Sequence, residues 1–268
     1  MQMTIAETFA ERLRARESLV GYWSMLDSAV AIERLARVGY DYVCVDAQHG
    51  FGGYPGLIHG LIAIDAAATS AALVRVAENS PMEIARALDA GASGVIVPLI
   101  NSAADAEVAA RSCRYPPRGI RSYGPIRSRL GRSADTTDRD RDVVCLAMVE
   151  TADGLANVEA VAEVAGVDGL YVGPSDLSLV LGARFPGDPL VTSEFERALV
   201  RIRNAAEASG KAVGIHCASG EAAAKRLAEG FTFASVASDI VHLEAAATAH
   251  LAACTELRGG PILGRPGA

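Results

Sequence analysis

The chain has 268 residues, half of them hydrophobic and 21% charged, and its formal net charge is −7. This length suits one large α/β domain, and an acidic chain without a basic tract argues against nucleic acid as the main partner. The longest apolar stretches are strand-sized, so no membrane span is expected. The segment MQMTIAETFAERLRARE predicts a charged amphipathic helix and lacks the apolar region of a signal peptide.

The rest of the chain alternates strand-like and helix-like segments. Strands are expected at 19–26, 40–47, 70–78, 94–100, 143–150, 169–176, 211–218 and 231–239. Helices are expected at 28–39, from the Gly-rich turn after residue 49 to about 68, and at 80–91, 102–113, 152–165, 193–209, 220–230 and from about 240 to 256.

The strand-like runs are continuously apolar, which is typical of parallel strands that are buried on both faces. Eight βα units in about 250 residues predict a (β/α)8 TIM barrel, here with an extra N-terminal helix. A doubly wound open sheet is the alternative, but no GxGxxG turn follows the first strand. The barrel is expected to form one domain over residues 1–256, followed by a Gly/Pro-rich tail at 257–268.

Five cysteines are scattered without the CxxC spacing of a zinc site or the pattern of a disulfide framework. Three of them lie inside apolar, strand-like runs. Free buried thiols are typical of a reducing compartment, so the protein is expected to be cytoplasmic.

Polar residues follow several of the expected strands. His49 follows the second strand, and Arg75, Glu150, Asp176 and His216 lie near the ends of later ones. In a TIM barrel the carboxyl ends of the strands meet at one face, and functional residues collect there. These side chains are therefore expected to lie close together.

Glu150 and Asp176 are open to two interpretations. Two carboxylates suit a hard divalent cation such as Mg²⁺ or Mn²⁺, which could act as a Lewis acid and stabilise an enolate. Alternatively, each carboxylate caps the helix that follows it. A nearby Arg would add positive charge where negative charge develops, and a neutral His can act as a general base. The two lysines, Lys211 and Lys225, do not lie at strand ends, which argues against Schiff-base chemistry.

Five ordered motifs carry a family resemblance. They are DAQHG, LVRVAENSP with LDAGASGVIVPLI, RYPPRGIRS, MVETADGLANV and VDGLYVGPSDLSLVLG, and they extend over most of residues 18–250. The sequence resembles the HpcH/HpaI family of class II pyruvate aldolases, such as the 4-hydroxy-2-oxoheptanedioate and 2-dehydro-3-deoxyglucarate aldolases. The resemblance implies a homo-oligomer, commonly a hexamer arranged as a trimer of dimers, with the C-terminal helix exchanged between subunits. It also implies reversible cleavage of a 4-hydroxy-2-oxo acid into a 2-oxo acid and an aldehyde.

The resemblance also assigns roles to individual residues, with a divalent cation (Mg²⁺, Mn²⁺ or Co²⁺) and no organic cofactor. Glu150 and Asp176 match the metal ligands, His49 the base, and Arg75 the residue that stabilises the enolate oxygen. Asp89 matches an acid that pairs with the His, although by itself it would be interpreted as a solvated carboxylate at a helix end. Gly173 and Ser175 match positions in contact with the substrate.

Two positions depart from the family pattern. Met148 stands where relatives often carry a Gln that touches the oxo acid, and Met cannot donate a hydrogen bond. His216 occupies a position that is apolar in well-known relatives; it either contacts the substrate or is a core His bonded to a backbone carbonyl. Both residues are expected to affect which substrate is accepted.

Arginines crowd the segment from Arg114 to Arg132, which is expected to be a long connection. Such a run is most often a solvated or subunit-contacting surface, but long connections are often functional. This one could attract an anionic substrate.

Three other functions are weighed against the aldolase. The metal pattern is shared with acyl-CoA lyases of the citrate lyase and malyl-CoA lyase type. The barrel fold and the metal-stabilised enolate are shared with phosphonopyruvate-type carbon–phosphorus enzymes. A non-catalytic metabolite-binding homologue is the third, and the joint presence of His49, Arg75, Glu150 and Asp176 argues against it.

Overall fold

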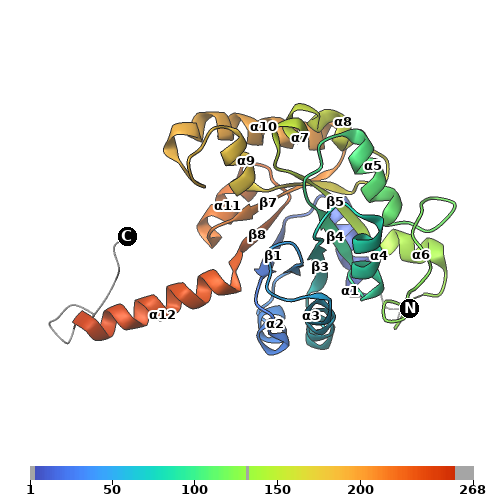
Figure 1. The fold of residues 1–268 in the computed structure, drawn as a ribbon, viewed down its shortest axis with the longest axis horizontal. Coiled ribbons are helices and arrows are strands. Elements are labelled where there is room, and N and C mark those ends of the chain that lie inside the picture. Colours follow the sequence, from blue (N-terminus) through green and yellow to red (C-terminus); the bar gives the residue numbers. More distant parts are fainter. Residues whose placement is uncertain (1–3, 131–132, 257–268) are drawn as a thin grey trace.

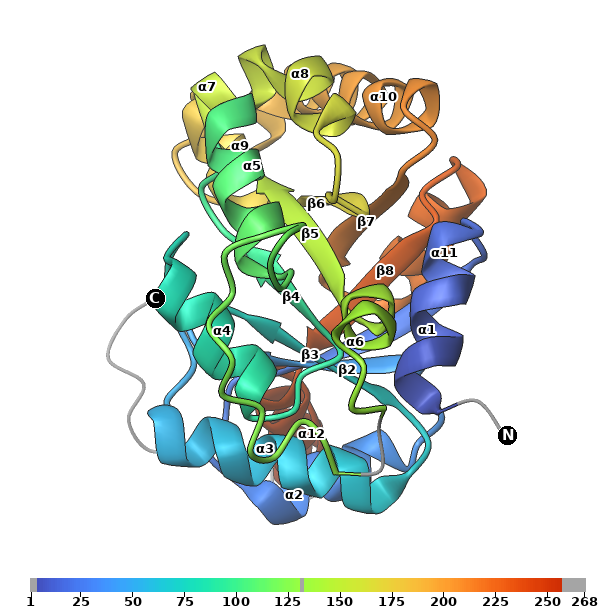
Figure 2. The same cartoon turned by 90° about the vertical axis from the view of Figure 1, so that its right-hand side faces the viewer.

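The computed structural model describes residues 4–130 and 133–256, and it confirms the predicted (β/α)8 barrel. Eight parallel strands close in sequence order, with β1 paired to both β2 and β8. Helices surround the strands in both views (Figures 1 and 2). The strands are β1 (Leu19–Ser24), β2 (Tyr42–Asp46), β3 (Ala71–Arg75), β4 (Gly94–Val97), β5 (Val144–Val149), β6 (Gly169–Val172), β7 (Ala212–Cys217) and β8 (Phe233–Ser238).

The described helices include the expected ones and several short additions. They are α1 (Ile5–Arg14), α2 (Ala29–Ala36), α3 (Tyr54–Ala67), α4 (Pro81–Asp89), α5 (Ala103–Ser112), α6 (Thr136–Asp142), α7 (Ala152–Ala156), α8 (Val158–Glu163), α9 (Pro174–Val180), η1 (Pro189–Val191), α10 (Thr192–Ala208), α11 (Gly220–Ala228) and α12 (Asp239–Glu256).

Two apolar layers hold the barrel together. One fills its interior and includes Tyr42, Tyr171 and Phe233, while the other lies between the strands and the surrounding helices. The large rings fit because neighbouring strands carry glycine: a Cβ at Gly21 would collide with the ring of Tyr42, and one at Gly214 with that of Phe233.

The predicted N-terminal helix is α1. Its N-terminus is closed by a capping box between Thr4 and Glu7. Its buried face, with Phe9, Ala10 and Leu13, joins the interior layer of the barrel. An amphipathic helix thus covers interior side chains that the strands alone would leave exposed.

Several expected boundaries were wrong, and one of them concerns the site. Strand β6 ends at Val172, four residues before the expected end, because Pro174 begins α9. Proline is favoured in the first turn of a helix, where its missing N–H is not needed. Ser175 and Asp176 therefore lie in the first turn of a helix. The single helix expected at 152–165 is two helices, α7 and α8, and α6 was not anticipated.

The C-terminal helix α12 leaves the barrel. Figure 1 shows it extending away from the strands, and its residues from Val241 to Cys254 are exposed. Its exchange between subunits stays a prediction, and the tail at 257–268 lies outside the described residues. Among the helices of the described chain, none is long and apolar enough to cross a membrane.

Candidate active site

A cavity of about 190 Å³ opens at the carboxyl ends of the strands. Seven of the residues that the sequence proposed as site residues line it: His49, Arg75, Met148, Gly173, Ser175, Asp176 and His216. The rest of the wall comes from Trp23, Met25, Asp46, Pro174 and Ser238. The structure thus brings together side chains that are as far apart in the chain as Trp23 and Ser238.

A buried ion pair forms one side of the cavity. Asp46 ends β2 and Arg75 ends β3, and the two residues are directly paired in the parallel register. Arg75 Nε donates to Asp46 Oδ1 at 2.9 Å, and Arg75 Nη2 donates to Oδ2. The guanidinium also lies 5.1 Å from the centre of the Trp23 ring. This bidentate geometry fixes the position of the positive charge.

Asp46 is the functional residue that the sequence analysis did not single out. Besides Arg75, its carboxylate accepts hydrogen bonds from Trp23 Nε1 at 3.1 Å and from the backbone N–H groups of Gln48 and His49. Burial would raise the pKa of Asp46, but the hydrogen bonds and charge of Arg75 outweigh burial and lower it. Asp46 is therefore a carboxylate that orients Arg75 and the turn that carries His49. The feature of the sequence that could have indicated its role is an acidic residue at the end of a strand, three residues before a His.

Glu150 lies behind the cavity wall and is only 1% exposed. Its Oε1 accepts a hydrogen bond from Leu99 N–H at 2.9 Å, while Oε2 is buried and has no protein partner in the described chain. Burial raises the pKa of Glu150, and the charge of nearby Asp176 raises it further. A buried carboxylate oxygen without a partner is costly, so this atom is suited to a cation.

The backbone around Glu150 is built for close approach. Leu99 has a φ of 55°, a left-handed conformation that is rare outside glycine, and its N–H reaches the carboxylate. A Cβ at Gly173 would collide with Glu150 Oε2 and would approach Met148 Cε to 2.7 Å. Glycine is therefore required at position 173 if Glu150 is to lie directly behind the wall.

His216 lies on β7 and lines the same cavity as Asp176. Its ring stands edge-on to Trp23 with 5.2 Å between centroids. Burial and the charge of Arg75 lower the pKa of His216 to about 4, so the ring is neutral near pH 7. No hydrogen-bond partner to Nδ1 is found in the described chain, which argues against the interpretation that His216 is a core His satisfied by a backbone carbonyl.

Asp89 does not join this group. It ends α4, and its Oδ1 accepts a hydrogen bond from Arg121 Nη2 at 2.6 Å. A contact between Asp89 and His49 is not found among the described residues of a single chain, so the implied pairing stays a prediction. Here the partner of Asp89 is the buried guanidinium of Arg121.

Arg121 belongs to the arginine-rich connection, which is tied to the barrel by ion pairs. Arg114 pairs with Asp168, Arg118 with Asp140, and Arg127 with Asp65. These contacts hold the described part of the segment against the barrel and its helices. The four arginines that are paired in this way give no support to an anion-attracting role.

The protein groups at the cavity can supply only part of the ligand set of a hard divalent cation. Across residues 4–130 and 133–256, no cluster of three or more His, Cys, Asp or Glu side chains could hold a metal ion. Glu150 and Asp176 are two hard oxygen donors, and one of them has a buried unpartnered oxygen. Mg²⁺ commonly keeps several waters and is held by one or two carboxylates plus substrate oxygens, so two protein ligands suffice.

Comparisons with known proteins agree with this chemistry. The HpcH/HpaI aldolase/citrate lyase family matches residues 19–246. The hydroxypyruvate/pyruvate aldolase of Rhizorhabdus wittichii is 41% identical over 236 residues, covering 87% of this chain and 92% of the relative. The 4-hydroxy-2-oxo-heptane-1,7-dioate aldolase of Escherichia coli (strain ATCC 8739) is 36% identical over 247 residues, with 90% and 92% covered.

A solved structure agrees as well. The HpcH/HpaI aldolase/citrate lyase family protein of Burkholderia cenocepacia J2315 superposes with a TM-score of 0.82 at 33% identity, covering 94% of this chain and all of that one. Because the similar curated proteins are named aldolases, the aldolase prediction fits better than the acyl-CoA, carbon–phosphorus and non-catalytic alternatives. This chain belongs to the HpcH/HpaI aldolase/citrate lyase family, and its activity is that of an aldolase, a carbon–carbon lyase.

Proposed function

We propose that the chain is a divalent-cation-dependent aldolase that joins a small 2-oxo acid, such as pyruvate or hydroxypyruvate, to an aldehyde and also catalyses the reverse cleavage. The observation that carries this proposal is the unpartnered, buried Oε2 of Glu150, near Asp176 and near the fixed charge of Arg75. Negative and positive groups close together at one small cavity suit a donor that carries a carboxylate and a keto oxygen.

Arg75 supplies the fixed positive charge. A guanidinium has five N–H donors, and Asp46 occupies two of them. The remaining donors are available to the oxygen on which negative charge develops when the 2-oxo acid loses its C3 proton. A charge held in place before the reaction needs no reorganisation, which is the main source of electrostatic catalysis.

His49 is the proposed base. It is exposed at the cavity wall, and its backbone is anchored to Asp46. The base removes a proton from C3 of the 2-oxo acid, and C3 then bonds to the carbonyl carbon of the aldehyde. The aldehyde oxygen takes up a proton and becomes the 4-hydroxyl group, so no net proton is gained or lost.

Glu150 and Asp176 would hold the divalent cation. When bound, Mg²⁺, Mn²⁺ or Co²⁺ supplies Lewis-acid polarisation of the 2-oxo group. The remaining contacts to the donor come from the cavity wall, where we propose that Gly173 and Ser175 approach its carboxylate. The role proposed for Asp89 stays the one that the resemblance implies, an acid that pairs with His49.

We also propose two properties of the whole protein. The exposed apolar residues of α12, including Val241, Leu243 and Leu251, support docking of this helix on another copy of the chain. Free buried thiols at Cys44, Cys113, Cys145 and Cys217 support a cytoplasmic location.

An activity screen tests the proposed reaction. Pyruvate and hydroxypyruvate, each with several aldehydes, should give 4-hydroxy-2-oxo acids in buffer with Mg²⁺, Mn²⁺ or Co²⁺. Excess EDTA should stop the reaction, and the cation should restore it. Full activity in excess EDTA, or cleavage of acyl-CoA substrates alone, would contradict the proposal.

Replacing Glu150 tests the cation site without measuring activity. A carboxyl group whose pKa is raised in the folded protein lowers the stability of the fold when the pH is above the ordinary pKa of Glu, because the buried group must then ionise. At pH 7.5 Glu150→Gln should therefore raise the Tm of the cation-free protein. A shift of a few degrees is expected, since about 1 kcal/mol corresponds to ~2–4 °C in a chain of this size. Mn²⁺ should raise the Tm of the unmodified protein but not that of the variant.

The matched control is Glu159→Gln, which removes a carboxylate on the surface of α8. This variant should keep the full thermal response to Mn²⁺. An equal response in Glu150→Gln and the unmodified protein would show that the cation binds elsewhere.

Arg75→Lys tests whether fixed geometry matters in addition to charge. One ammonium group cannot make both bonds to Asp46 and also face the donor oxygen. We expect kcat to fall about 10²–10³-fold, while Mn²⁺ affinity stays within about twofold. Arg197→Lys, at an exposed ion pair in α10, should leave kcat unchanged; an equally small effect at Arg75 would remove it from the mechanism.

Substitutions at Met148 and His216 test donor specificity. Met148→Gln adds a hydrogen-bond donor, so the kcat/KM ratio of hydroxypyruvate to pyruvate should rise several-fold, in line with about 1 kcal/mol per hydrogen bond. His216→Leu removes a polar group and should lower the same ratio. If neither variant changes the ratio, these two residues do not select the donor.

A further inference from the structure

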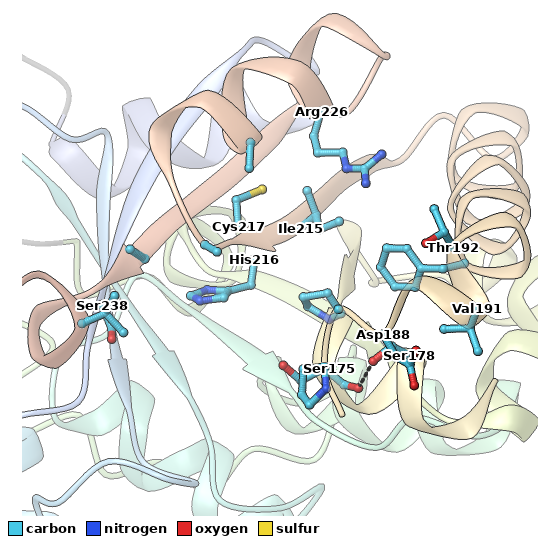
Figure 3. A pocket seen from close by; sticks show the side chains of 18 residues that line it. Ser175, Ser178, Asp188, Val191, Thr192, Ile215, His216, Cys217, Arg226 and Ser238 are labelled. Atoms are coloured by element: carbon cyan, nitrogen blue, oxygen red, sulfur yellow. Dashed lines mark hydrogen bonds between the residues drawn. The ribbon is translucent and has the colours of Figure 1, made fainter. Parts of the chain in front are cut away.

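A second cavity is larger than the one that holds the proposed catalytic groups. It has a volume of about 470 Å³ and lies between α9, the start of α10, β7 and α11 (Figure 3). We call it the side chamber. A cavity of about 150 Å³ can hold a benzene molecule, so this one is large enough for an aryl or branched alkyl group.

The side chamber is adjacent to the catalytic cavity. Four residues line both spaces: Pro174, Ser175, His216 and Ser238. Of these, His216 and Ser175 come from different elements, β7 and α9 (Figure 3). Because both residues line both spaces, they lie where the two spaces meet. The catalytic cavity and the side chamber therefore border on each other at His216.

The walls of the side chamber are mainly apolar. Val191, Phe195 and Ile215 supply large apolar side chains, and Ala222 and Ala237 leave room between them. A bound group would remove this surface from water, and burial of apolar surface stabilises a complex by about 25 cal/mol per Å².

The charged groups of the chamber are already paired. Arg226 donates to both oxygens of Glu196 at 2.7 Å and to Glu229 at 2.8 Å. Asp188 accepts hydrogen bonds from the backbone and the guanidinium of Arg184. His216, at the boundary, is neutral near pH 7 because burial and Arg75 depress its pKa to about 4. A second carboxylate on the substrate would thus find no unpaired cation in this wall.

We propose that the side chamber receives the side chain of the acceptor aldehyde, and that the acceptor is an uncharged aldehyde with a bulky apolar group. This inference rests on the proposed aldolase function and specifies its substrate class. The new bond forms between C3 of the 2-oxo acid and the aldehyde carbon in the catalytic cavity, while the rest of the aldehyde occupies the chamber. In the reverse reaction the same space accepts the apolar end of the 4-hydroxy-2-oxo acid.

The first part of the test compares acceptors with pyruvate as donor. In the unmodified protein, kcat/KM for 3-phenylpropanal should exceed that for succinic semialdehyde by about tenfold or more, because the carboxylate of the latter would lose its water without gaining a partner. A preference for succinic semialdehyde would overturn the proposal.

The second part fills the chamber. Ala222→Trp places a large ring in the space, and Ala224→Trp, on the exposed side of the same helix, is the matched control. We expect Ala222→Trp to lower kcat/KM for 3-phenylpropanal about tenfold or more while that for glycolaldehyde stays within about twofold. Thr192→Phe, an exposed position on the opposite wall, should act in the same direction and provides a second variant if Ala222→Trp does not fold.

Exchange of the C3 protons of pyruvate with solvent, measured without an aldehyde, separates the two proposals. It depends on the catalytic cavity alone and should be unchanged in the chamber variants. If the unmodified protein does not catalyse this exchange, the proposed aldolase mechanism itself is refuted. Normal exchange, with 3-phenylpropanal and glycolaldehyde affected equally or not at all by filling the chamber, would refute only the acceptor site, as expected if another copy of the chain covers this space.

Discussion

The buried ion pair between Asp46 and Arg75 is the constraint on which the rest of the site depends. In the closed parallel barrel the ends of β2 and β3 lie side by side, and Asp46 and Arg75 are paired in the register of these strands. The Asp46 carboxylate also accepts hydrogen bonds from Trp23 and from the turn that carries His49. Removing either charge would leave the other buried without its counter-ion, which costs about 3–5 kcal/mol.

The pKa values of the two buried acids, Asp46 and Glu150, are shifted in opposite directions because their partners differ. Asp46 is satisfied by Arg75, and its pKa is lowered despite burial. Glu150 has only the N–H of Leu99 and lies close to another carboxylate, and its pKa is raised. One acid therefore serves as a permanent anchor for an arginine, while the other retains an unsatisfied oxygen for an added cation. The left-handed conformation of Leu99 and the missing side chain at Gly173 are local features that keep Glu150 in this position.

The sequence predicted the barrel and the gathering of His49, Arg75, Glu150, Asp176 and His216 because both follow from simple periodicity. Buried parallel strands are apolar throughout, and their carboxyl ends share one face. The partner of each polar side chain does not follow from periodicity. Asp89 pairs with Arg121, 32 positions along the chain, and Asp46 anchors the site although it was noticed only as part of a motif. The side chamber was also missed, since it arises from α9 and η1, two short elements that carry little pattern of their own.

His216 links the polar and apolar parts of this arrangement. Had it been charged, it would have repelled Arg75 and offered a partner to an acidic acceptor, but burial keeps it neutral. The charged groups that act on the donor are consequently confined to one side of the ring, and the paired ions and apolar walls lie on the other. A site divided in this way can bind the 2-oxo acid by charge and discriminate between aldehydes by shape and apolar area. In the proposed arrangement, differences between acceptors arise in the side chamber, where each buried methylene contributes about 0.8 kcal/mol.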